Sequence, residues 1–182
     1  NIIMVPISNS FGKQYQGFKH DVQALSGIKQ VATSHYPMYN GYDMFFMHNK
    51  TSKEEIAMPV LSVDAAFIPT LDIKWKIPPV TASILTSPKK VVINEMAISK
   101  LKLAPNPIGK VVDFGRQQQY EVAGVVKDFN FSSLQGTIGP LCLFITPDNN
   151  GDWGTQGGCL FAKISPRTNL PTLIESIQSI YR

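Results

Sequence analysis

The chain has 182 residues, of which 43% are hydrophobic, 10% aromatic and 16% charged. This composition excludes intrinsic disorder, which requires low hydrophobicity and high charge, and the length suits one ordinary domain or two small ones. The formal net charge is +4, but the lysines are scattered and never form a run longer than two. A nucleic-acid-binding surface would need them clustered on one face. We therefore expect a packed domain that binds no nucleic acid.

The first 48 residues are predicted to form a strand, a helix and a second strand. An apolar run at 2–7 is followed by a helix over 11–27, with Ser10 as its N-cap and Gly27 as its stop. The second strand covers 29–37. The apolar residues of the helix recur at spacings of four and three, which places them on one face. They are Phe11, Tyr15, Phe18, Val22 and Leu25.

A turn-rich segment with many aromatic and methionine side chains follows this second strand. Two interpretations stay open. The segment is either an adaptable apolar contact surface for a partner or the packing between two subdomains. The candidate contact residues are Tyr36, Met38, Tyr39, Tyr42, Phe45 and Phe46, with Met44 and Met47 interleaved.

Residues 49–157 are predicted to form mainly short strands joined by proline-rich connections. Residues 58–64 read as a strand, and 65–73 as a short helix weakened by Pro69. The strand 91–94 ends at Asn94, which is placed to cap a helix over 95–103. Two apolar arms separated by the sequence GRQQQ then predict a hairpin over 108–129.

The last 25 residues mirror the beginning of the chain, with a strand at 158–164 and a helix at 169–182 that has Asn169 near its start. We therefore expect an α+β fold of two subdomains, one of which is discontinuous in sequence. One is a βαβ/βα lobe from both chain ends, residues 1–48 and 158–182, and the other is a strand-rich lobe inserted at 49–157. The apolar face of the last helix is predicted to comprise Leu170, Leu173, Ile174, Ile177 and Tyr181.

The sequence carries no motif for catalysis, cofactor binding or metal binding. No P-loop, G-x-G-x-x-G or G-x-S-x-G is present, and His20, His35 and His48 lack the spacing of metal ligands. Asp128 follows an apolar strand, where an Asp is usually a turn residue bonded to its own backbone. We therefore expect a protein without a cofactor that is not an enzyme.

The two cysteines, Cys142 and Cys159, both lie inside apolar runs. We expect two buried thiols that pack as small hydrophobic side chains. A disulfide between them is the alternative, and it requires that the fold bring their Cα atoms within about 7 Å.

Two long runs of the sequence resemble a known family. The runs VVINEMAISKLKLAPNPIGKVVDF and YEVAGVVKDFNFSSLQGTIGPLCLFI are similar to the MacB-like periplasmic core domain of FtsX-like ABC transporter permeases. The segments IIMVPISNSFGKQYQGFKHDV and NLPTLIESIQSIYR resemble its beginning and its closing helix. At Met96 the sequence departs from the small residue that is more usual in the family. The resemblance implies that the lobe from both ends is porter-like and the inserted lobe sabre-like.

The resemblance also implies a function and a location. The chain would be a domain excised from a permease on the periplasmic side of the bacterial inner membrane, where it relays ATP-driven motion to a substrate or partner protein. A cytoplasmic ATPase subunit would act on it through the membrane helices, and the permease would be a homodimer or heterodimer. Further implied partners are a periplasmic adaptor, a lipoprotein or a lipid substrate. The alternative is a secreted ligand-binding module or enzyme with a pocket between its two lobes.

Overall fold

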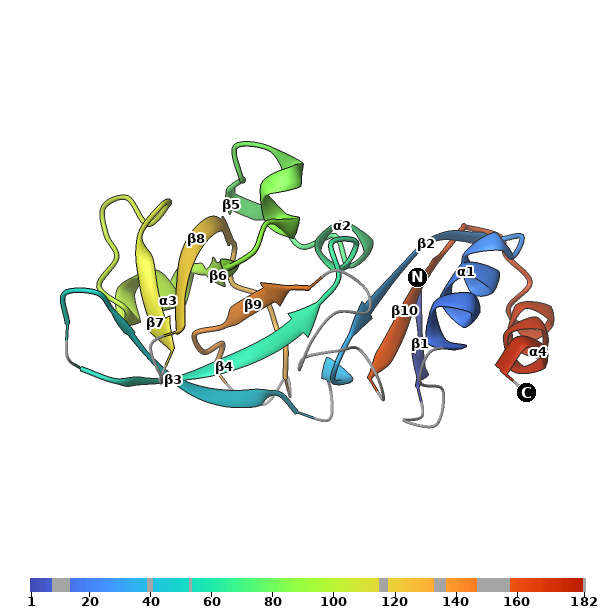
Figure 1. Cartoon of the computed structure of the whole chain (residues 1–182). Helices are drawn as coiled ribbons and strands as arrows, with labels where there is room; N and C mark the ends of the chain where they lie inside the picture. Colours follow the sequence, from blue (N-terminus) through green and yellow to red (C-terminus); the bar gives the residue numbers. More distant parts are fainter. Residues whose placement is uncertain are drawn as a thin grey trace. The chain divides into compact units, whose positions relative to one another are not determined.

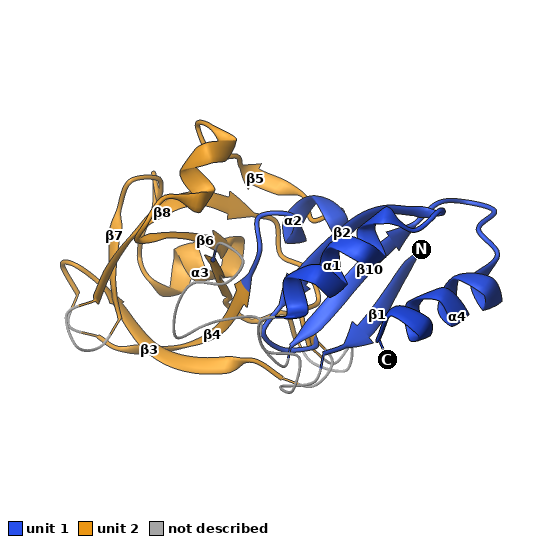
Figure 2. Ribbon diagram, turned by 45° about the vertical axis from the view of Figure 1, so that its right-hand side comes forward, with its two compact units in different colours: residues 1–37, 63–72, 146–182 blue, residues 38–62, 73–145 orange. Residues whose placement is uncertain are grey.

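The computed structural model describes residues 1–7, 14–38, 41–52, 54–114, 118–132, 137–146 and 158–181. They form a mixed α+β fold (Figure 1). The chain divides into two compact units, coloured separately in Figure 2. Unit 1 comprises 1–37, 63–72 and 146–182, and unit 2 comprises 38–62 and 73–145.

Unit 1 contains a three-stranded antiparallel sheet in the order β1-β10-β2. The strands are β1 (Ile2–Pro6), β10 (Cys159–Ile164) and β2 (Ile28–Ser34). Because β1 and β2 both run antiparallel to β10, the β1–α1–β2 crossover is split by a strand from the other end of the chain. The two chain ends therefore pair directly within this unit.

Two helices bury their apolar stripes on one face of this sheet. They are α1 (Tyr15–Ala24) and α4 (Leu170–Tyr181), and their edges meet where the rings of Phe18 and Tyr181 lie 5.5 Å apart. The short helix α2 (Phe67–Thr70) packs on the other face, with Phe67 against Phe161 at 5.5 Å. The core between the sheet and the two long helices consists of Ile7, Tyr15, Phe18, Val22, Val31, Leu160, Ala162, Ile164, Leu173 and Ile177.

The strands of unit 2 close into a ring in the order β4-β3-β7-β8-β6-β9, because β9 also pairs with β4. Neighbouring strands are antiparallel where their registers are known, except that β6 and β8 run parallel. A short strand, β5, pairs with β8 outside the ring. The ring strands are β3 (Asp43–Asn49), β4 (Ile56–Val63), β6 (Lys90–Asn94), β7 (Val111–Phe114), β8 (Gln118–Val126) and β9 (Cys142–Ile145).

Three smaller elements decorate this ring. The strand β5 (Trp75–Ile77) leads into the 3-10 helix η3 (Ala82–Thr86), and the helix α3 (Glu95–Lys100) follows β6 directly. Ring closure leaves fewer strand edges exposed than an open sheet would.

Several sequence-based expectations are confirmed. The helix before Gly27, the Asn94 cap and the pairing of β7 with β8 are all present, whereas Ser10 and Phe11 lie outside the described residues. Within α4 the predicted apolar face is wrong in part. Leu173 and Ile177 are buried, but Leu170 and Ile174 are 40% and 43% exposed.

The segment expected to be rich in turns contains a strand instead, β3. Phe45 and Met47 alternate with Met44 and Phe46, and this period of two is the signal that the aromatic composition concealed.

Candidate functional site

The buried side chain of Asn94 joins three segments of unit 2. Its Oδ1 accepts hydrogen bonds from the backbone N–H of Ala97 at 3.1 Å and of Leu141 at 2.8 Å. Its Nδ2 donates to the carbonyl oxygen of Gly139 at 2.9 Å. Asn94 is 0% exposed, and its two bonds to the backbone N–H groups are buried, whereas the bond to Gly139 is partly buried. One amide therefore caps α3 and fixes the approach to β9.

Asp128 and Glu95 cap one another's segments next to this amide. The Asp128 Oδ1 accepts from the backbone N–H of Met96 at 3.0 Å, and the Glu95 Oε2 accepts from the backbone N–H of Asp128 at 3.2 Å. The expectation that Asp128 bonds to its own backbone is therefore wrong, because its carboxylate binds the first turn of α3. The acid at the end of the apolar strand holds a helix in place.

Lys76 completes this cluster from β5. Its Nζ lies 2.8 Å from the Glu95 Oε1. The hydrogen bond from Lys76, followed by that from the Asp128 backbone, holds the pKa of Glu95 below its usual value. The pair consists of a cation and an ionised carboxylate, an arrangement that stabilises local structure and supplies no nucleophile.

Gly124 explains the apolar sequence VAGVV within β8. A Cβ at this position would lie 2.8 Å from the Trp75 ring, so glycine leaves the room in which the indole packs. The register between β6 and β8 shifts at this point, where Val91 pairs with Val122 and Val92 with Gly124. The strand is apolar because it is buried in the ring and covered by β5.

The described residues contain no group of three or more His, Cys, Asp or Glu that could hold a metal ion. Cys142 and Cys159 are buried free thiols, as the sequence predicts. Burial raises the pKa of Cys142 and raises the pKa of Cys159 to about 11, so neither is activated as a nucleophile.

The six predicted contact residues do not form one surface within a single unit. Tyr36 belongs to unit 1, whereas the other five positions belong to unit 2. Tyr39 lies outside the described residues. Tyr42 and Phe45 are half-buried, with their rings 5.7 Å from Phe131 and 6.2 Å from Phe114 respectively.

Only one side of β3 is open to solvent. Met44 is 50% and Phe46 is 58% exposed, and Ala57, which pairs with Phe46 on β4, is exposed as well. We call Met44, Phe46 and Ala57 the β3 surface. It contains Phe46 from the predicted contact residues, while Tyr36, which is 37% exposed, lies in the other unit.

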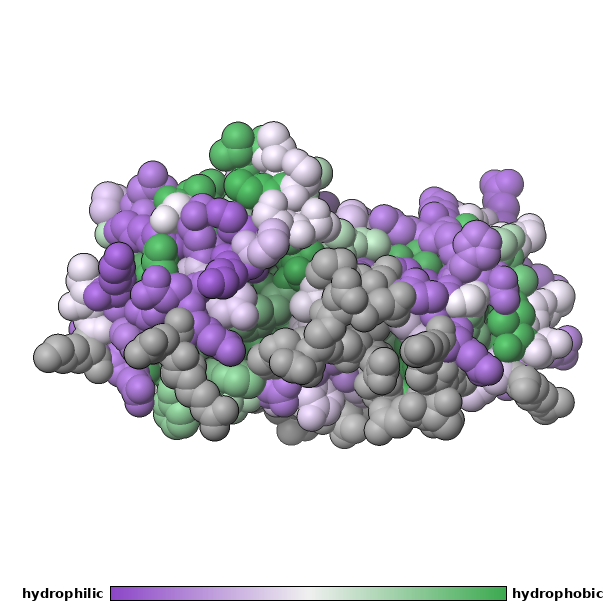
Figure 3. Space-filling model, in the orientation of Figure 1, coloured by the Kyte–Doolittle hydropathy of each residue, from purple (hydrophilic) through white to green (hydrophobic). Residues whose placement is uncertain are grey.

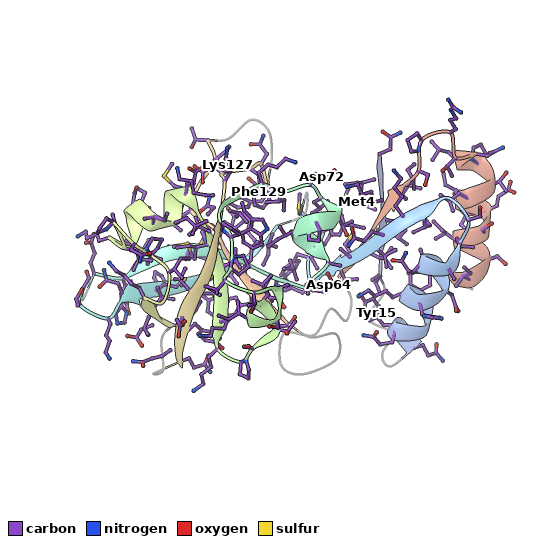
Figure 4. All side chains as sticks on the ribbon, turned by 90° about the horizontal axis from the view of Figure 1, so that it is seen from above. Met4, Tyr15, Asp64, Asp72, Lys127 and Phe129 are labelled. Atoms are coloured by element: carbon purple, nitrogen blue, oxygen red, sulfur yellow. The ribbon has the colours of Figure 1, made fainter. Side chains whose placement is uncertain are left out.

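Unit 1 has a buried ionic cluster at the start of the segment leading to α2, where Figure 4 labels Asp64. The Asp64 Oδ2 lies 2.9 Å from the Lys19 Nζ and accepts a hydrogen bond from the Thr33 Oγ1 at 2.8 Å. Its Oδ1 accepts from the backbone N–H of Ala66 at 3.0 Å. Asp64 is 2% exposed. The cluster connects α1, β2 and the α2 segment, and no local sequence pattern predicts it.

No protein-family model matches the sequence, and no curated protein matches it. Solved structures do match the fold. The periplasmic region of MacB from Actinobacillus actinomycetemcomitans is 16% identical with a TM-score of 0.63, over 100% of this chain and 84% of that one.

Two further structures are similar over nearly the whole chain. A domain assigned to a permease protein of Porphyromonas gingivalis is 12% identical with a TM-score of 0.66, over 98% of this chain and 80% of that one. The extracellular domain of the ABC-type transporter YknZ from Gram-positive bacteria is 12% identical with a TM-score of 0.65, over 95% and 88%. The chain therefore has the fold of MacB-like periplasmic domains.

Proposed function

We propose that this chain is an extracytoplasmic domain of an ABC transporter permease and that it relays ATP-driven motion to a substrate or partner protein. The observation that carries the proposal is the similarity to three transporter domains over at least 95% of this chain. In the part of the chain that the structure describes, no helix is long and apolar enough to cross a membrane. On this proposal the spanning helices belong to flanking sequence.

In this proposal unit 1 is the porter-like lobe and unit 2 the sabre-like lobe. The chain passes between the two units four times, because residues 63–72 of unit 1 separate the two parts of unit 2. Several crossing points suit a domain in which one lobe moves relative to the other as a body. The domain would have no catalytic role, and in keeping with this Asp64, Glu95 and Asp128 cap backbone N–H groups and both thiols are buried.

The partners follow from the same proposal. A cytoplasmic ATPase would act through the membrane helices, and the β3 surface would contact an adaptor, a lipoprotein or a second permease subunit. Exposed Phe and Met side chains adapt to different partners and contribute apolar area on binding.

The experiment measures motion in the complete transporter. Spin labels at Ser83→Cys in unit 2 and Glu175→Cys in unit 1 occupy exposed positions. The two native thiols are buried and should remain unlabelled. We expect the distance between the labels to change between the nucleotide-free and the ATP-trapped complex.

The control pair is Lys29→Cys with Glu175→Cys, both exposed within unit 1, and its distance should stay constant. An unchanged distance for the first pair would remove the relay role. A full-length gene without apolar segments of about 20 residues on either side would instead favour the secreted module.

A further inference from the structure

A charge-free loop projects from unit 2 between β5 and β6. Residues 77–88 contain no charged side chain. Val80 is 82% exposed, and Pro78, Ala82 and Pro88 are also exposed. We call residues 77–88 the tip. Figure 3 shows green, apolar spheres at the top of the molecule, where Figure 1 places β5 and the loop that follows it.

The tip is held rigidly by its own hydrogen bonds and by two apolar anchors. Ser83 accepts at its carbonyl oxygen from the Thr86 hydroxyl at 3.0 Å and from the Ser87 hydroxyl at 3.3 Å. Leu85 is only 7% exposed, and Trp75 packs on Gly124 at the base. Val80 follows Pro78 and Pro79, whose rings restrict the backbone, so presenting it to a partner costs less conformational entropy than an unrestricted loop would.

Lysines flank the tip on both sides. Lys74 and Lys76 precede it, Lys89 and Lys90 follow it, and Lys127 lies beside Lys74, whose carbonyl accepts its backbone N–H at 2.8 Å. Lys76 and Lys90 pair with Glu95 at 2.8 Å and Glu121 at 2.7 Å.

Within the described residues, the exposed Lys74, Lys89 and Lys127 form no direct ion pair, although the charge of Lys127 helps to lower the pKa of Glu95. Figure 4 labels Lys127 just after β8. The tip is therefore an uncharged apolar projection with lysines around its base. This arrangement is complementary to a lipid layer, which is apolar inside and can be anionic at its surface.

We propose that the tip docks on an anionic lipid surface, with Val80 and its neighbouring prolines entering the headgroup region and Lys74, Lys89 and Lys127 contacting lipid phosphates. A convex apolar tip suits insertion into a lipid layer better than the recognition of one protein side chain, which requires a pocket. This inference rests on unit 2 alone and does not require the transporter function.

The test is co-sedimentation of the 182-residue chain with vesicles of phosphatidylcholine alone and with added phosphatidylglycerol. We expect binding to the anionic vesicles only, weakening as salt is added. The double variant Lys74→Gln/Lys89→Gln should bind about 25-fold more weakly, at roughly fivefold for each lysine near the surface. Val80→Ser should also weaken binding.

Matched controls separate docking from simple charge. Lys29→Gln/Lys50→Gln removes the same charge at exposed positions outside the tip, and Phe46→Ser removes an exposed apolar side chain from the β3 surface. Both should bind nearly as the native chain does. Equal losses for the two lysine pairs would overturn the proposal in favour of non-specific attraction. If the chain bound neither kind of vesicle, the proposal would also be overturned. The tip would then be expected to contact a protein partner with an acidic rim.

Discussion

Each unit fixes a short helix with a buried polar side chain, but the two units use different chemistry. In unit 1 the carboxylate of Asp64 caps the segment leading to α2 and is neutralised by Lys19. In unit 2 the neutral amide of Asn94 caps α3 and also donates to Gly139. Both side chains are at most 2% exposed.

The difference reflects what surrounds each side chain. A carboxylate can only accept hydrogen bonds, so its burial requires a cation, and α1 supplies Lys19 from 45 residues away. An amide both donates and accepts, so Asn94 satisfies one carbonyl and two N–H groups without any charge. The formal charge of the chain fits this contrast, because by sequence unit 1 is neutral and the whole excess of +4 lies in unit 2.

The largest expected effect comes from a methyl group added to one glycine in each unit, Gly158 just before β10 and Gly124 within β8. In unit 1 the Cβ of Gly158→Ala would collide with the Ser34 carbonyl oxygen, which is backbone and cannot move alone. In unit 2 the Cβ of Gly124→Ala would meet the Trp75 ring at 2.8 Å, and that side chain can tilt away. We expect losses of unfolding free energy of about 4 and about 1.5 kcal/mol respectively. Denaturant titration of both variants measures this, and equal losses would contradict it.

Asp64→Ala tests the ionic cluster of unit 1. It removes the carboxylate that Lys19, Thr33 and the Ala66 N–H bind, so we expect a loss of about 3 kcal/mol. Asp64→Asn is the matched control, because it keeps an oxygen for the Ala66 N–H and removes only the charge. It should fall between the native chain and Asp64→Ala in denaturant titrations. Native stability in Asp64→Asn would mean that the charge contributes nothing.

Asn94→Ala tests the amide of unit 2, and we expect a loss of about 2 kcal/mol, because two N–H groups and one carbonyl lose their partner. Asn94→Asp is the sharper variant. It keeps both acceptor bonds but buries a carboxylate for which the structure shows no cation partner. The carboxyl should therefore remain protonated far above its usual pKa, and the variant should lose stability as pH rises from 4 to 7. A stability difference from the native chain that does not change with pH would show that the two units tolerate charge alike.

Local patterns in the sequence predicted much of the fold. The features that the sequence did not predict depend on contacts between segments far apart in the chain. The cap at Asn94 and the β7–β8 hairpin follow from residues close together in the chain. The closure of β9 on β4 and the binding of Asp128 to Met96 join segments more than 30 residues apart, and no local pattern encodes them.

For the predicted contact segment, too, the sequence did not predict which side chains are exposed. Its aromatic composition identified the region, but the register of β3 decides that Phe46 faces solvent while Phe45 faces Phe114. A shift of one residue would have exchanged them.

The smallest expected effect concerns the pair of Lys76 and Glu95, whose side chains are 51% and 31% exposed. The pKa of Glu95 is lowered in the folded state, chiefly by its hydrogen bond with Lys76. The pair therefore stabilises the fold above the unfolded-state pKa of about 4.3, and this contribution disappears as pH falls through the lower, folded-state pKa. Glu95→Gln should be slightly less stable than the native chain at pH 7 and should approach it in stability near pH 3. Lys76→Gln is expected to show the same convergence, because either substitution removes the same attraction. The measurement is the denaturation midpoint of each variant and of the native chain at several pH values. If the stability difference between Glu95→Gln and the native chain is the same at pH 3 as at pH 7, the carboxylate acts through packing and not through its charge.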